Sequence, residues 1–168
     1  MISVLFVCLG NICRSPIAEA TFRAVVEEKG LSNKIRCDSA GTHNYHIGEL
    51  PDERTRKNAL NHGLNLTHKA RKLGGKDFAD FEYIVAMDDS NLDFIRAMHN
   101  KTAGFYPDAD TVFLLREFDP QNTHAAVPAF SVPDPYFGDA QGFEEVYQVV
   151  RRSNEQLIAY ILEREKLG

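Results

Sequence analysis

The chain has 168 residues, of which 43% are hydrophobic and 26% are charged, and its net charge is −5. This length predicts a single domain, spanning 1–168, that can bury about 70% of its unfolded surface without disulfides or metals. The negative charge argues against nucleic acid and membranes as partners, and the chain has no apolar run of about 18 residues that would predict a transmembrane helix.

The first predicted elements are a strand, a tight loop and a helix. The apolar run Ile2 to Val7 is typical of a buried strand. After a loop over 8–15, a helical pattern runs from Pro16 to Lys29, with Ser15 as the expected N-cap and Gly30 as the expected C-terminal cap. A strand, loop and helix N-terminus in this order form an anion-binding arrangement, because backbone N–H groups converge there and the helix dipole favours negative charge.

The loop contains residue types suited to phosphate chemistry. Cys8 provides a nucleophile at its start, and Arg14 provides a planar, permanently charged fork for two phosphate oxygens. The helix N-terminus and the arginine both favour the thiolate form of Cys8, and the Ser15 hydroxyl can hydrogen-bond to it. Gly10 and Asn11 tolerate the unusual φ values that a loop needs to wrap around an anion.

Other interpretations of the cysteines are weaker. The N-terminal run lacks the positive region of a secretory signal, because no Lys or Arg precedes Arg14. Cys8 and Cys13 lack the usual spacing of metal ligands. A lone cysteine is most often a small core residue, but the nearby arginine and the strand–loop–helix context favour a nucleophile. With Cys37 the chain has three cysteines, which cannot all pair, so a reducing, cytoplasmic setting is expected.

Farther along the chain, strand and helix patterns alternate. This alternation predicts a mostly parallel, doubly wound sheet covered on both faces, with ligands bound at the carboxyl ends of its strands. A loop is expected over 42–51, and a long proline-containing irregular segment precedes the last helix. The expected strands are 35–39, 83–87 and 111–115, and the expected helices are 52–62, 76–81, 88–99 and 142–166.

Asp134 is the candidate general acid. Thiolate attack on a phosphate ester is slow if the leaving group departs as an anion, so a proton donor is needed. Prolines on both sides restrict the backbone and can hold this carboxyl at a fixed reach. Asp-Pro is also a common way to open a turn, so the residues alone leave the two interpretations about even.

The stretch VCLGNICRSP resembles the signature of the low-molecular-weight protein tyrosine phosphatase family, and DPYF at 134–137 resembles its DPYY. The resemblance covers nearly the whole chain. It implies a three-layer, flavodoxin-like fold with four parallel strands in the order 2-1-3-4. It also implies hydrolysis of phosphotyrosine without metal or cofactor: Cys8 forms a phosphocysteine, Arg14 binds phosphate oxygens, and Asp134 acts first as acid and then as base.

The resemblance also implies a loop-supporting network of Asn11, Ser39 and His68, although the residues alone fit an ordinary strand-end serine and a surface histidine. Tyr45 stands where many members carry Trp, and Phe137 where many carry a second Tyr. Aromatic walls would form a slot too deep for phosphoserine. The residues expected to bind substrate are Leu9, Gly10, Asn11, Ile12, Cys13, Ser15, Tyr45, Tyr136 and Phe137.

The expected partners are a phosphotyrosine protein or a small aryl phosphate, with inorganic phosphate as product, and the expected state is a monomer or weak dimer. The acidic residues over 87–91 are expected to cap a helix rather than to act in catalysis. An arsenate reductase would need more cysteines than Cys37 beyond the loop, and a phosphoarginine phosphatase fits bulky Ile12 less well. A non-catalytic phosphate-binding module would not need Asp134. Cys13 is expected to protect an oxidised Cys8 through a disulfide.

Overall fold

The computed structural model describes residues 1–168 and contains one four-stranded sheet. The strand order is β2-β1-β3-β4 and every pairing is parallel, which confirms the predicted topology. Because β1 lies between β2 and β3, the strand order reverses beside its carboxyl end, where such sheets bind ligands. The strands are β1 (Ile2–Cys8), β2 (Ile35–Gly41), β3 (Tyr83–Ala86) and β4 (Val112–Leu114).

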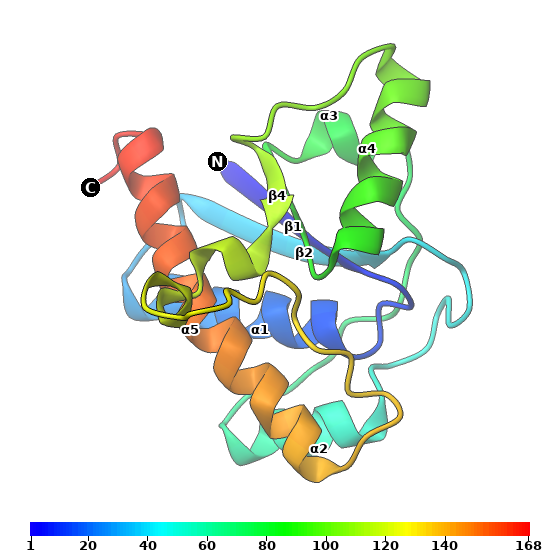
Figure 1. Ribbon diagram of the computed structural model, residues 1–168, viewed down its shortest axis with the longest axis vertical. Helices are drawn as coiled ribbons and strands as arrows, with labels where there is room; N and C mark the ends of the chain where they lie inside the picture. The colour runs from blue at the N-terminus through cyan, green and yellow to red at the C-terminus, as the bar shows by residue number, and fades with distance from the viewer.

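Helices cover both faces of the sheet (Figure 1). Successive residues of a strand point to opposite faces, so Val4 and Phe6 join the core beneath α1 and α5, whereas Leu5 and Val7 join the core beneath α4. Helix α2 packs against α5. The helices are α1 (Arg14–Glu28), α2 (Glu53–Asn61), α3 (Asp77–Asp80), α4 (Asp89–Ala103) and α5 (Ala140–Arg164).

The start of α1 differs from the prediction. The helix begins at Arg14, and the N-cap position is held by Cys13, whose side chain makes no capping hydrogen bond. Ser15 is therefore not the N-cap. Its hydroxyl lies inside the first turn and contacts Cys8 instead. The Ser15 hydroxyl bonds with Cys8 and Asn11 rather than with a backbone N–H group of the helix.

Several other boundaries lie one to four residues from the predicted ones. Strand β2 continues to Gly41, where the loop after β1 passes so close that a Cβ atom would lie 2.8 Å from the Leu9 carbonyl oxygen. Helix α4 continues to Ala103 and ends at Gly104, which has φ +85. Helix α5 begins at Ala140, because the Asp139 side chain accepts a hydrogen bond from a backbone N–H of its first turn. Two 3-10 turns, over 115–118 and 120–123, lie within the segment expected to be irregular.

None of the helices has both the length and the apolar character that crossing a membrane requires.

Candidate active site

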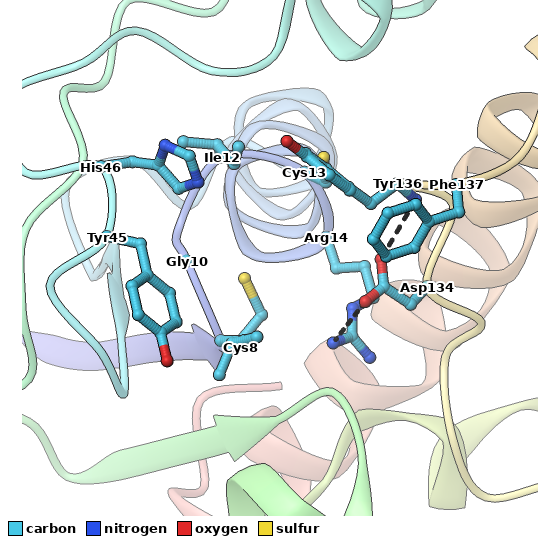
Figure 2. Close-up of a pocket in the computed structure, with 11 residues that line it drawn as sticks. Cys8, Gly10, Ile12, Cys13, Arg14, Tyr45, His46, Asp134, Tyr136 and Phe137 are labelled. Atoms are coloured by element: carbon cyan, nitrogen blue, oxygen red, sulfur yellow. Dashed lines mark hydrogen bonds and ion pairs between the residues drawn. The ribbon is translucent and has the colours of Figure 1, made fainter.

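A cavity of about 220 Å³ lies at the carboxyl end of β1, where the sheet topology places a ligand. Figure 2 shows that its lining comes from three segments far apart in the chain: the loop after β1, the 42–51 loop and the segment before α5. These segments supply nearly all of the residues predicted to contact substrate. The lining residues are Cys8, Leu9, Gly10, Ile12, Cys13, Arg14, Tyr45, His46, Asp134, Tyr136 and Phe137.

Two predicted substrate-binding residues, Asn11 and Ser15, do not line this cavity. Both are fully buried behind the loop. Asn11 has φ 59, a left-handed conformation that asparagine reaches more easily than most residues. Its amide nitrogen donates to Ser15 Oγ at 2.8 Å and to Ser39 Oγ at 2.9 Å. Asn11 and Ser15 therefore support the loop from beneath.

The bracing network reaches α1 and the segment after α2. Asn11 Oδ1 bonds with His68 Nε2 at 2.7 Å and accepts from the backbone N–H of Arg71 at 3.0 Å. Ser39 donates to Glu19 Oε1 at 2.7 Å. These contacts join the three residues predicted to support the loop. Glu19, a buried carboxylate of α1, was not predicted, although an acidic residue within the apolar face of a helix is a signal that could have revealed it.

Glu19, Asp38 and His68 also form a group with metal-ligand chemistry. His68 Nδ1 lies 3.4 Å from a carboxylate oxygen of each of the other two. Burial raises the pKa of Asp38, but hydrogen bonds from His68 and the backbone, together with Arg71, hold it below its usual value. Hydrogen-bond donors of the protein already contact these carboxylate oxygens. The loop-supporting network therefore explains why the three residues lie together.

The Cys8 thiol is buried at the bottom of the cavity, 3.0 Å from Ser15 Oγ. Ser15 Oγ already accepts a hydrogen bond from Asn11, so its own proton is available to the sulfur. The N-terminus of α1 lies at the same place, because the helix begins at Arg14. Helix dipole and hydroxyl both favour negative charge on Cys8 Sγ.

Arg14 is 4% exposed and is held on one side. Its Nη1 donates to Asp88 Oδ2 at 2.8 Å and to the Val132 carbonyl at 3.1 Å. The Nε and Nη2 groups form the opposite edge of the fork, which suits two anion oxygens. Asp88 caps α4 as predicted, through the backbone N–H of Asn91. Its ion pair with Arg14 was not predicted.

Asp134 lies beside Arg14 at the wall of the cavity (Figure 2), with its Oδ2 3.7 Å from Arg14 Nη2. Its Oδ1 accepts a hydrogen bond from the backbone N–H of Tyr136 at 3.1 Å. The segment is anchored by Val132, whose N–H donates to the Met87 carbonyl at 2.7 Å. The Asp134 side chain is half exposed, so both water and a leaving group can reach it.

Aromatic side chains form the upper walls. Tyr45 stacks on His43 with ring centroids 5.4 Å apart, and Tyr136 meets the edge of Phe137 at 5.0 Å. Phe137 is 95% exposed, so it is not held by packing within the chain. His46 also lines the cavity and was not predicted, although it directly follows Tyr45.

Cys13 lies on the same loop and lines the same cavity as Cys8. Burial raises the pKa of the Cys13 thiol to about 12, so the group is neutral under ordinary conditions. The two thiols are therefore chemically different. Cys8 lies where a helix N-terminus and a hydroxyl favour its anion, whereas Cys13 lies in apolar surroundings with Ile12, Ala70 and Phe143.

Comparison with known proteins supports a single family. The family model for low molecular weight phosphotyrosine protein phosphatase matches residues 3–167. The human protein of that description is 44% identical over 146 residues, which cover 87% of each chain.

Solved structures agree with the sequence comparison. A protein tyrosine phosphatase from Entamoeba histolytica, crystallised with Hepes in its active site, has a TM-score of 0.85 and 34% identity, covering 98% of this chain and 99% of that chain. An arginine phosphatase from Drosophila has a TM-score of 0.84 and 32% identity, covering 94% of this chain and 96% of that chain.

Proposed function

The chain belongs to the low molecular weight phosphotyrosine protein phosphatase family, and from this premise we propose that Cys8, Arg14 and Asp134 hydrolyse phosphotyrosine through a phosphocysteine intermediate. One observation carries the assignment of these roles. The buried thiol, the Nε–Nη2 edge of a buried guanidinium and a half-exposed carboxylate all border one cavity at the helix N-terminus.

In the first step, the phosphate sits in the loop between β1 and α1. Loop N–H groups and the Nε–Nη2 edge of Arg14 bind its equatorial oxygens, where negative charge is spread in the transition state. Cys8 Sγ attacks phosphorus from the side opposite the ester oxygen. The S–P bond forms as the P–O bond breaks, and Asp134 gives its proton to the departing phenolate oxygen.

In the second step, water replaces the phenol. The Asp134 carboxylate, now without its proton, accepts one from the water as it attacks phosphorus. The S–P bond breaks, the thiolate returns and inorganic phosphate leaves. The Ser15 hydroxyl, 3.0 Å from the sulfur, stabilises the returning negative charge.

The walls of the cavity favour an aryl phosphate. Ile12, Tyr45 and Tyr136 border the space above the thiol, and a phenol ring of phosphotyrosine would contact them. Phosphoserine is shorter and would reach the sulfur only by bringing its peptide backbone into the slot. The substrate is therefore proposed to be a phosphotyrosine protein or a small aryl phosphate. A reduced Cys8 is required, which suits a cytoplasmic location.

Turnover on matched substrates tests this function. Peptides of one sequence carrying phosphotyrosine, phosphoserine or phosphoarginine are compared, together with arsenate reduction. Burying an aromatic ring contributes about 1.5–3 kcal/mol, so phosphotyrosine should exceed phosphoserine in kcat/KM by about 10- to 150-fold. Phosphoarginine is the second candidate because an arginine phosphatase has so similar a structure. Faster hydrolysis of phosphoarginine than of phosphotyrosine would contradict the proposal.

Cys13 is proposed to protect Cys8 from irreversible oxidation. Peroxide converts the Cys8 thiolate to a sulfenic acid, and attack by the Cys13 sulfur then forms a disulfide and releases water. Wild type should recover most of its activity when a dithiol follows peroxide, and mass spectrometry should find a Cys8–Cys13 disulfide. Cys13→Ser, compared with its own activity before oxidation, should recover much less. Equal recovered fractions would mean that Cys13 only fills space.

A further inference from the structure

A second basin of about 370 Å³ lies between α2 and the start of α5. Six of its eight lining residues are polar. One of these is acidic, Glu144, and the other five have side chains that can donate hydrogen bonds: Arg54, Lys57, Asn58, Asn61 and Gln141. Neither the proposed reaction nor the loop-supporting network uses these residues.

Arg54 connects this basin to the candidate active site. Its guanidinium lies 5.5 Å from the centroid of the Tyr136 ring and 4.7 Å from that of Phe143. Tyr136 is a wall of the catalytic cavity, whereas Phe143 lines the basin. Arg54 contacts the Tyr136 ring without lining the catalytic cavity, so a peptide whose phosphotyrosine ring rests against Tyr136 has this positive charge close by.

The Arg54 fork is already oriented. Its Nε donates to Asp52 Oδ1 at 3.0 Å and its Nη2 to Asp52 Oδ2 at 2.9 Å, so one edge of the fork is occupied. Asp52 is itself fixed, because it caps α2 through the backbone N–H of Arg54. The Nη1 group points away from this edge and is free to donate. An arginine held in advance loses less conformational entropy when it binds a carboxylate.

The charges around the basin leave a positive group for a ligand. Lys57 lies three residues after Arg54, on the same face of α2. It is exposed and forms no salt bridge. Asp52 is occupied by Arg54, and Glu144 is held by His62 and Asn58. The side chains that remain for a ligand are therefore donors, in a chain whose net charge is −5.

We infer that this basin binds an acidic side chain of the peptide substrate, close in sequence to the phosphotyrosine. The inference rests on the proposed phosphotyrosine hydrolysis and adds a preference for its peptide context. An extended chain advances about 3.3–3.6 Å per residue, so a glutamate about one to three residues from the phosphotyrosine can reach across the Tyr136 wall. The carboxylate would accept hydrogen bonds from Arg54 Nη1 and from the Lys57 ammonium.

The test is a glutamate scan of a neutral phosphotyrosine peptide at positions on both sides of the modified residue. For each protein, kcat/KM on an acidic peptide is divided by kcat/KM on the neutral one, so that any general effect of a mutation on the site cancels. The variants are Lys57→Gln, Lys57→Glu and the double variant Arg54→Gln with Lys57→Gln. The matched control is Lys101→Gln, an exposed lysine near the end of α4, far from α2 (Figure 1).

Two exposed charge pairs, one with Arg54 and one with Lys57, should make wild type prefer the best acidic peptide by about two- to thirtyfold, mainly through KM. The preference should fall with rising salt, shrink in Lys57→Gln, disappear in the double variant and reverse toward lysine-flanked peptides in Lys57→Glu. Lys101→Gln should keep it. If wild type hydrolyses the neutral peptide but shows no preference, or if the double variant keeps the preference, the inference is wrong and the proposed function stands. If wild type hydrolyses no phosphotyrosine peptide, both are wrong.

Discussion

Replacing Cys8 with serine is expected to abolish turnover while phosphate binding survives. A serine hydroxyl at this place is a far poorer nucleophile than a thiolate, whereas the loop N–H groups and Arg14 that bind the anion are unchanged. Removing the nucleophile of a hydrolase costs about 10⁴–10⁶-fold in kcat. Hydrolysis of an aryl phosphate measures the loss, and calorimetric titration with inorganic phosphate measures the binding that remains.

The chain offers a matched control for this experiment. Cys37→Ser removes a thiol that does not line the cavity and whose sulfur contacts the Glu19 carbonyl at 3.6 Å. Its turnover should stay close to that of wild type. Substantial turnover by purified Cys8→Ser, insensitive to thiol reagents and free of contaminating phosphatase, would show that the nucleophile is elsewhere.

Replacing Asp134 with alanine is expected to slow hydrolysis of phosphotyrosine by about 10²–10⁴-fold, because a positioned general acid contributes that much. The loss in the phosphorylation step should shrink for aryl phosphates whose leaving group is already a stable anion, since these need no proton. Single-turnover measurement across a series of substituted phenyl phosphates separates this step from hydrolysis of the intermediate. The slope of rate against leaving-group acidity should become steeper in the variant.

The Asp134→Asn variant separates a role of this residue in proton transfer from a role in holding the turn. Asparagine can accept the same hydrogen bond from the Tyr136 N–H, which is 3.1 Å from Asp134 Oδ1, but it has no proton to give the phenolate. If Asp134 is the acid, the asparagine variant should be nearly as slow as the alanine variant. Recovery of most of the wild-type rate in Asp134→Asn, or an equal loss for every leaving group, would assign the residue a role in the turn alone.

Local sequence patterns determined much of the fold. Apolar runs and alternating helix patterns predicted every strand and helix within a few residues, because propensity and burial act over short stretches. Cys8 and Arg14 flank one short loop, so their proximity also followed from the sequence. The strand order came from the family resemblance, since periodicity carries no information on which strands are neighbours, and the structure confirms it.

The tertiary structure alone decided which polar groups meet. Arg14 bonds with Asp88, 74 residues away, and with the Val132 carbonyl, 118 residues away. Ser15 bonds with the thiol rather than with its own helix, and Arg54 lies against the Tyr136 wall. A hydrophobic pattern shows which face of an element is buried, but it does not specify the donor or acceptor that a buried polar group will find. That choice depends on how distant backbone segments pack. In this protein it determines both the network that supports the loop and the side chains beside the Tyr136 wall.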